Sequence, residues 1–386
     1  MGDLEQYSSC QAGKVHQIKA VIFDLDGTLL NSEQFTEGVV KEFLARYGKV
    51  YDMEKESKRR GMLWKETVLT TIEDYDLPLT FEQYVEGIMP LYLGTWQKTK
   101  PLPGATRLMK HLHKHGVPFG LASNAERMTI HNKVNHQGWK DYFRVILGSD
   151  QVKSGKPAPD IYLEAAKQMG VEPVYCLVIE DSLVGVRAGK AAGMNVVAVP
   201  SLLNEREKFY IADSVINSLL EFQPDVWGLP AFKDWVCNAL PIEPIYVRGV
   251  HSNGLLHEHS EGGPYLPIQL QGLYFGWARR NHDQQIVKFL TSIEWEHKKS
   301  HFRKRMQACV INDNSENAPD QELELLLVGY IRGSKSDDMG KESNLEIQDE
   351  DKLIANAALD SSEYSGGSCR SFFPELAFLD NSSATE

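Results

Sequence analysis

The chain has 386 residues, of which 42% are hydrophobic and 24% are charged. At roughly 150 residues per domain this length predicts two or three domains, and the composition excludes a wholly disordered or membrane-embedded chain. Acidic residues outnumber basic ones by 53 to 41, so the formal net charge is −12. We therefore expect no nucleic acid and no membrane as partner, whereas a small phosphorylated metabolite could still bind through local cations and a metal.

The first residues and the cysteines indicate a cytoplasmic protein. Residues 1–6 contain two acids and no basic or apolar segment, so we expect no secretory or transit peptide. No apolar run approaches the roughly 18 residues of a membrane-spanning helix. The five cysteines lie far apart and form no CxxC pair, which predicts reduced thiols and neither a disulfide framework nor a zinc site.

Alternating apolar strands and helical segments predict a doubly wound, parallel α/β domain over residues 17–222. The first strand is expected at 18–23, and residues 32–98 after it show helical spacing without a strand, which predicts a helical insertion. The remaining expected elements are strands at 117–122, 143–147, 176–179 and 196–199 and helices at 108–112, 161–169 and 185–192.

The pattern changes after residue 222. Four prolines break residues 223–244, which we interpret as an inter-domain connector. Apolar β-type runs then predict a smaller, mostly antiparallel β domain over 245–360, with strands at 245–250, 271–278, 286–293 and 322–331. Residues 333–351 and the tail 361–386 are rich in Ser, Gly, Asp and Glu and are expected to be loose, and one helix is expected over 345–359.

Two carboxylates follow the first predicted strand, in the segment DLDGT at residues 24–28. Ligands of open α/β sheets bind at the carboxyl ends of the strands, so Asp24 and Asp26 are expected at a binding site. A nucleophilic carboxylate beside a second, protonatable carboxylate makes covalent phosphoryl transfer possible. Gly27 permits the tight turn that follows.

Other polar side chains lie at the ends of later predicted strands: Ser123, Asn124, Lys156, Glu180 and Asp181. A hydroxyl and an ammonium group can bind phosphate oxygens, and the second acidic pair can complete a Mg²⁺ site with Asp24. Each segment is commonplace by itself, and a lone lysine is usually a surface residue. Their order at successive strand ends favours one phosphate site.

This order of motifs resembles the haloacid dehalogenase superfamily over about residues 17–220. The resemblance implies that Asp24 is the nucleophile and forms an aspartyl-phosphate, and that Asp26 protonates the leaving oxygen and then activates water. It implies that the insertion at 32–98 is the mobile cap of small-molecule phosphatases. It further implies phosphate binding by Ser123, Asn124 and Lys156, and Mg²⁺ binding by Asp24, the backbone carbonyl of Asp26, and Asp181, with Glu180 close by.

The whole chain resembles the plant bifunctional FMN phosphatase/riboflavin kinases, through segments such as GLYFGWA at 272–278 and VGYIR at 328–332. The second half is therefore expected to be a riboflavin-kinase-like barrel. The kinase's Pro-Thr-Ala-Asn tetrapeptide does not occur in residues 249–272, and Gln307 stands where the family has its catalytic glutamate. Glutamine cannot act as a general base at neutral pH, which predicts a degenerate kinase domain.

The leading interpretation is a Mg²⁺-dependent phosphatase acting on FMN or a similar nucleotide or sugar phosphate. The first alternative keeps a working kinase and makes the protein bifunctional in flavin metabolism. The second is a non-catalytic flavin-binding or regulatory protein. The intact set of motif residues argues against this last alternative, and the missing tetrapeptide argues against the bifunctional enzyme.

Overall fold

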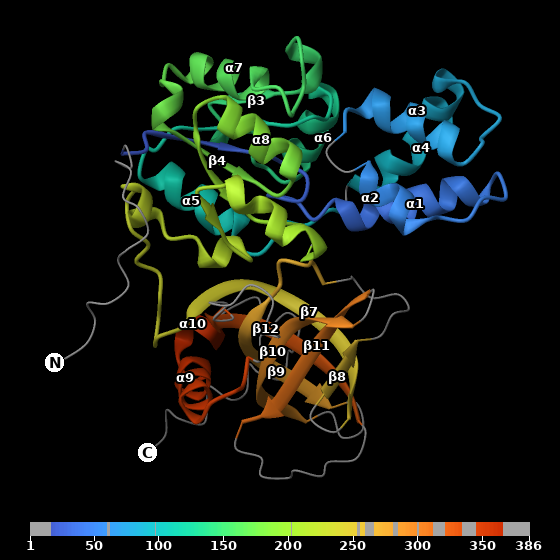
Figure 1. The fold of residues 1–386 in the computed structure, drawn as a ribbon. Coiled ribbons are helices and arrows are strands. Elements are labelled where there is room, and N and C mark those ends of the chain that lie inside the picture. The colour runs from blue at the N-terminus through green and yellow to red at the C-terminus, as the bar shows by residue number, and fades with distance from the viewer. Residues whose placement is uncertain are drawn as a thin grey trace, which may run out of the picture.

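The computed structural model describes residues 17–59, 62–96, 98–201, 203–252, 255–258, 266–280, 285–298, 301–311, 321–333 and 345–365. An α/β domain, a helical cap beside it and a β-barrel below it are separate bodies of the chain (Figure 1). Within the described ranges, no helix is both long and apolar enough to cross a bilayer.

The α/β domain contains one parallel sheet in the order β3-β2-β1-β4-β5-β6, which confirms the predicted doubly wound architecture. Its strands are β1 (Ala20–Phe23), β2 (Phe119–Ala122), β3 (Val145–Leu147), β4 (Cys176–Glu180), β5 (Asn195–Ala198) and β6 (Ser214–Val215). Its helices are α5 (Ala105–Lys114), α6 (Arg127–His136), α7 (Asp160–Met169) and α8 (Leu183–Ala191). The short edge strand β6 was not predicted.

Both faces of this sheet are covered by helices, because successive side chains of a strand point to opposite faces. In β1, Val21 and Phe23 pack into a core with α5 and α6. Ala20 and Ile22 pack into the opposite core with α7 and α8. The all-apolar sequence of β1 is therefore explained by burial on both sides, and it leaves Asp24 as the first polar residue at the strand's carboxyl end.

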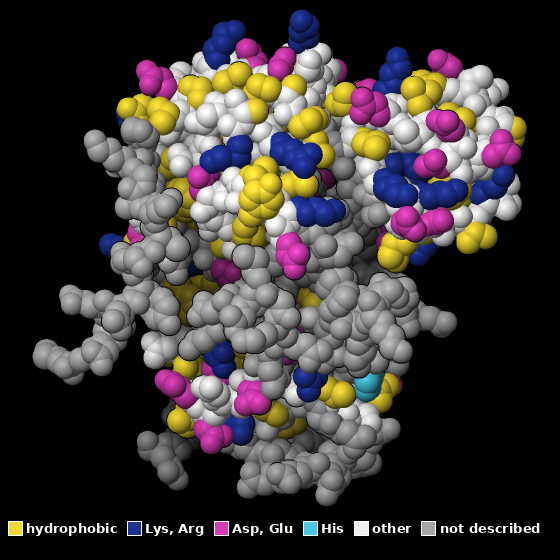
Figure 2. All heavy atoms as spheres, in the orientation of Figure 1, with side chains coloured by type: hydrophobic (Ala, Val, Ile, Leu, Met, Phe, Trp, Pro, Cys, Tyr) yellow, Lys and Arg dark blue, Asp and Glu magenta, His cyan; other side chains and the backbone are white. Residues whose placement is uncertain are grey.

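The insertion forms a four-helix cap with its own hydrophobic core, which includes Phe43, Val68 and Ile88. The helices are α1 (Glu33–Ala45), α2 (Met53–Lys58), α3 (Trp64–Asp74) and α4 (Phe81–Trp96). Figure 2 shows basic and acidic side chains interspersed over the visible face of the cap and the α/β domain. Because the cap packs on itself, it is a separate unit held to the sheet domain by two chain connections.

The second half is a closed six-stranded barrel in the order β10-β11-β8-β7-β12-β9, and its paired strands are antiparallel. Its strands are β7 (Leu240–Ser252), β8 (Leu255–Glu258), β9 (Gly272–Arg280), β10 (Ile286–Lys298), β11 (His301–Val310) and β12 (Gln321–Arg332). The sequence did not predict β8 and β11. Charged residues interrupt β11, so it lacks the apolar run by which the other strands were recognised.

The segment after the barrel is more ordered than its composition predicts. Leu345 is buried, and its backbone N–H donates to the Glu294 carboxylate at 2.6 Å, so the expectation of a loose 333–351 is wrong there. The predicted helix begins at Asp349 instead of 345, giving α9 (Asp349–Leu359), and α10 (Ser362–Ser365) lies in the predicted tail. These helices cover one side of the barrel (Figure 1). Residues 334–344 and 366–386 lie outside the described residues.

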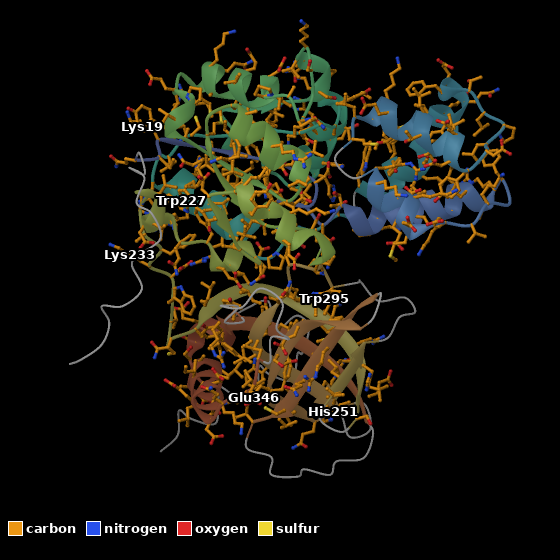
Figure 3. The ribbon with its side chains drawn as sticks, viewed as in Figure 1. Lys19, Trp227, Lys233, His251, Trp295 and Glu346 are labelled. Atoms are coloured by element: carbon orange, nitrogen blue, oxygen red, sulfur yellow. The ribbon has the colours of Figure 1, made fainter. Side chains whose placement is uncertain are left out.

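The connector packs against helix α5. Trp227, which is labelled in Figure 3, is buried in the α/β core. Arg107 of α5 makes two hydrogen bonds to Asp234, at 2.7 and 2.8 Å, and its guanidinium lies 3.5 Å from the centre of the Phe232 ring. His111 of α5 contacts the Pro230 carbonyl oxygen at 2.7 Å.

Six short 3₁₀ helices complete the described elements: η1 (Lys140–Tyr142), η2 (Ser149–Gln151), η3 (Pro173–Tyr175), η4 (Leu203–Ile211), η5 (Leu219–Glu221) and η6 (Pro224–Trp227).

Candidate active site

The loops after β1, β2, β3 and β4 meet at one edge of the sheet. Adjacent parallel strands end at the same edge, so residues far apart in the chain converge there. The side chains of Asp24, Ser123, Lys156, Glu180 and Asp181 are all buried at this edge.

Lys156 links two of the carboxylates. Its Nζ lies 2.6 Å from Asp24 Oδ1 and 2.7 Å from Glu180 Oε1. Burial alone lowers the pKa of Lys156, but the Asp24 and Glu180 carboxylates outweigh burial and hold this pKa well above its ordinary value. The lysine is therefore a permanent cation at the end of β1.

Glu180 is fully occupied by donors from the protein. Its Oε1 accepts from Lys156 and from the Tyr162 hydroxyl at 3.2 Å, and its Oε2 accepts from the Ser182 backbone N–H and hydroxyl at 2.8 and 2.9 Å. Gly185 makes room for it, since a Cβ there would lie 1.6 Å from Glu180 Oε1. These contacts fix Glu180 in place and let it orient Lys156.

Three buried carboxylates form a cradle for a cation. One oxygen of each of Asp24, Glu180 and Asp181 lies within 4.8 Å of the others. Asp181 packs against Gly27, where a Cβ would come 2.2 Å from Asp181 Oδ2, and Oδ1 accepts from the Thr28 hydroxyl at 3.4 Å. Position 27 therefore requires glycine for two reasons. A side chain there would collide with Asp181, and the backbone has a positive φ of 86°.

The charges of the site fit a divalent cation. Burial raises the pKa of Asp24 to about 7, Glu180 adds to this rise, and Lys156 opposes it. Asp26 adds a fourth carboxylate, paired with Lys133, beside the Asp24 and Glu180 carboxylates that share Lys156. Oxygen donors in a buried, acidic setting suit a hard cation such as Mg²⁺ or Ca²⁺.

The Ser123–Asn124 loop holds the Lys156 loop through the backbone. The Lys156 N–H donates to Asn124 Oδ1 at 2.9 Å, and Asn124 Nδ2 donates to the Lys156 carbonyl at 3.2 Å. The hydroxyl oxygen of Ser123 accepts from the Ala125 N–H at 3.1 Å. This geometry gives Asn124 the task of positioning Lys156, in addition to the phosphate contact that the sequence predicts for it.

Sequence reasoning missed Lys133, a buried lysine on α6. Its Nζ lies 2.6 Å from Asp26 Oδ1 and 5.8 Å from the centre of the Trp96 ring, at the end of the cap's last helix. Lys133 lies three residues after Ile130 and next to Val134, both fully buried, so it occupies the apolar stripe of α6. A charged residue in such a stripe was the signal that could have revealed it.

Replacing Lys133 by methionine is expected to lower kcat on an alkyl phosphate roughly 100-fold if Asp26 is the general acid and base that the sequence predicts, because Asp26 would lose the ion pair that orients it. The loss on p-nitrophenyl phosphate should be much smaller, since nitrophenolate leaves without a proton. Steady-state rates on both substrates measure the difference, with the exposed Lys140→Met as control. Equal losses on the two substrates would contradict a role in proton transfer.

The cap contacts the loop of Gly155 and Lys156 through Leu63, which immediately precedes α3. A Cβ at Gly155 would lie 2.4 Å from Leu63 Cδ2 and 2.9 Å from Asn124 Oδ1, so the loop passes tightly between the two. The cap therefore places the apolar side chain of Leu63 against this loop.

In the barrel, Gln307 lies on β11 opposite Ser292 of β10. The Ser292 hydroxyl donates to Gln307 Oε1 at 3.5 Å, and the Gln307 backbone carbonyl accepts from the Thr291 hydroxyl at 2.7 Å. The printed partner of the Gln307 amide oxygen is therefore a neutral hydroxyl group.

The comparisons with known proteins agree with this geometry. A family model described as haloacid dehalogenase-like hydrolase matches residues 21–199. The bifunctional riboflavin kinase/FMN phosphatase of Arabidopsis thaliana is 39% identical over 378 residues, covering 94% of this chain and 96% of that protein. The similarity therefore extends through the barrel.

Two further relatives match the first half. A probable pseudouridine-5'-phosphatase of Drosophila melanogaster is 36% identical over 230 residues, covering 58% of this chain and 100% of that protein. The mitochondrial (DL)-glycerol-3-phosphatase 1 of Arabidopsis thaliana is 36% identical over 227 residues, covering 56% of this chain and 76% of that protein.

Proposed function

The chain belongs to the haloacid dehalogenase-like hydrolase family, and on this premise we propose that it hydrolyses FMN or a similar small nucleotide or sugar phosphate. The observation that carries the proposal is the buried pair of Asp24 and Lys156, 2.6 Å apart, beside the Glu180–Asp181 carboxylates. FMN is favoured because the relative that matches both halves of the chain is named as an FMN phosphatase.

We propose Mg²⁺ as the cation of the site, held by Asp24, Asp181 and the backbone carbonyl of Asp26. Glu180 stays close by as the partner of Lys156, because protein donors already occupy both of its oxygens. When bound, the cation neutralises charge on the phosphoryl group and so supports attack by an anion.

The protein's own groups carry the proposed reaction. A carboxylate oxygen of Asp24 attacks phosphorus, the bond to the substrate's ester oxygen breaks, and Asp26 gives its proton to that oxygen. Asp26 then takes a proton from water, whose oxygen attacks the aspartyl-phosphate, and phosphate leaves with the Asp24 carboxylate restored. Ser123 and Lys156 bind the phosphoryl oxygens in both steps.

For the barrel we propose a riboflavin-kinase-like domain without kinase activity. The closed six-stranded barrel and the relative that matches the full chain support the descent of this domain from a riboflavin kinase. The amide side chain of Gln307 in place of a glutamate and the missing tetrapeptide support the loss of kinase activity. In this proposal the barrel binds flavin without converting it.

We also propose a cytoplasmic location. The described cysteines form no disulfide, which is consistent with a reducing compartment.

The substrate is tested on the full chain with a panel of FMN, pseudouridine monophosphate, glycerol 3-phosphate and fructose 1-phosphate, with Mg²⁺ or with EDTA. We expect Mg²⁺-dependent phosphate release, with the largest kcat/KM for FMN. A parallel assay with riboflavin, ATP and Mg²⁺, run on Asp24→Asn so that FMN is not hydrolysed as it forms, should form no FMN. Absence of phosphate release from the whole panel would overturn the phosphatase, and FMN formation would restore the bifunctional alternative.

A further inference from the structure

A turn of the barrel touches the DLDGT loop of the α/β domain. Residues 266–271 precede β9, and Gln269 Nε2 donates to the backbone carbonyl oxygen of Gly27 at 2.9 Å. Gln269 is 4% exposed, so this hydrogen bond is shielded from water at both ends. The two residues are 242 positions apart in the chain, and the bond joins the two halves of the protein at the catalytic loop.

The barrel holds this turn rigidly. The indole N–H of Trp295, which Figure 3 places at the barrel end nearest the α/β domain, donates to the Ile268 carbonyl at 3.1 Å. The Leu270 N–H donates to the Pro267 carbonyl at 3.0 Å, and Leu270 is fully buried in the barrel core. The turn therefore presents Gln269 in a fixed direction before any substrate arrives.

Other contacts also join the two domains. Leu219 packs in the α/β core, whereas the following residue, Leu220, packs in the barrel core. The Thr106 hydroxyl donates to the Glu243 carboxylate at 3.5 Å across the same boundary. Because adjacent residues of the chain belong to the two cores, a shift of the barrel is transmitted directly to the α/β domain.

Gly27 is the residue through which the contact reaches the chemistry. It lies between Asp26 and Thr28, its N–H donates to the Leu30 carbonyl at 2.9 Å, and its left-handed backbone packs on Asp181. Its carbonyl is fixed by Gln269, which leaves no free rotation of the peptide between Gly27 and Thr28. A donor from the barrel thus holds the peptide that follows Asp26 and packs on Asp181.

We propose that Gln269 is a positioning residue of the phosphatase site, so that catalysis by the α/β domain requires the docked barrel. This inference rests on the proposed phosphatase function. On this inference the barrel needs no kinase activity to contribute. It holds the DLDGT loop in the conformation that Asp24 and Asp26 need for phosphoryl transfer.

The test compares Gln269→Met with Gln271→Met in the full chain. Methionine keeps the length and volume of glutamine but has no N–H donor. Gln271 makes the matched control, because its Nε2 donates to the Ile268 carbonyl within the same turn, and Trp295 still satisfies that carbonyl when Gln271 is changed. Phosphate release, with Mg²⁺, is measured on p-nitrophenyl phosphate for both variants and the unchanged protein.

We expect Gln269→Met to lower kcat about ten- to a hundredfold with less than a twofold change in KM, since Ser123 and Lys156 are untouched. Amide hydrogen exchange of the peptide that contains residues 24–32 should become faster in Gln269→Met alone. Gln271→Met should behave as the unchanged protein in both measurements.

Unchanged kcat and exchange in Gln269→Met would overturn the inference, and so would equal losses in the two variants, which would indicate general loosening of the turn. The unchanged protein separates this inference from the function on which it rests. If it releases no phosphate from any substrate, the phosphatase proposal fails, whereas normal release with an inert Gln269→Met removes only the role of Gln269.

Discussion

Asp24→Asn is expected to lower phosphate release by about 10⁴-fold or more while the protein remains folded. The amide has the shape of the carboxylate but is not a nucleophile, so no aspartyl-phosphate can form. Lys156 keeps its second partner, Glu180, at 2.7 Å, and the site stays assembled. The measurement is phosphate release with Mg²⁺ on the preferred substrate, with the exposed Asp141→Asn as control.

Thermal unfolding should show that this loss of activity is not a loss of stability. The pKa of Asp24 is raised by burial from 3.8 to about 7 in the folded protein. Stability that depends on this group is fully present below about pH 4 and is lost as the pH rises through 7. In EDTA, Asp24→Asn should therefore be more stable than the unchanged protein at pH 8, with a smaller difference at pH 5.

Added Mg²⁺ should stabilise the unchanged protein at pH 8 and the variant less, because the variant has lost one of the anionic ligands. Phosphate release from Asp24→Asn at an undiminished rate would show that another group is the nucleophile. A stability difference that does not depend on pH would show that the ionised Asp24 costs the folded protein nothing.

Lys156→Met is expected to remove activity and to destabilise the protein by roughly 3–5 kcal/mol at pH 8. The ammonium group is buried between Asp24 and Glu180, and its removal leaves carboxylates in an apolar setting without their cation. The loss should shrink as the pH falls, because the unpaired carboxylates then take up protons. Urea unfolding at pH 8 and pH 5 measures both effects.

The matched control is Lys153→Met, an exposed lysine three residues earlier in the same loop, which should change neither stability nor turnover. Any trace of activity left in Lys156→Met should show a raised KM, because the proposed role of the lysine is to bind the phosphoryl group. A variant as stable as the unchanged protein at pH 8 would mean that the carboxylates are already neutral without the lysine.

Local sequence was sufficient for the fold of the first half. The apolar run of β1 and the alternation of strands and helices predicted the parallel sheet, because burial on both faces leaves no other composition for those strands. In the barrel the same criterion found β7, β9, β10 and β12 but missed β8 and β11. A strand with charged residues on its exposed side has no apolar run, so pairing with neighbouring strands determines where it forms.

In the candidate site, too, the sequence determined some features and the tertiary structure determined others. The sequence by itself determined the family, the carboxylate pair Asp24 and Asp26, and the order of the later motifs, because each motif lies in the segment that follows a strand specified by local composition. It could not determine that Glu180 serves Lys156, nor that Lys133 faces Asp26, because these contacts join residues 24 and 107 positions apart.

Only the tertiary structure decided what the barrel does for the catalytic loop. Nothing in the residues around Gln269 distinguishes it from Gln271, and its significance arises because domain docking places it at the Gly27 carbonyl. A hydrogen bond depends on distance and direction between two groups, and chain sequence fixes these only for near neighbours. For groups that the fold brings together, the packing of whole domains determines which contacts exist.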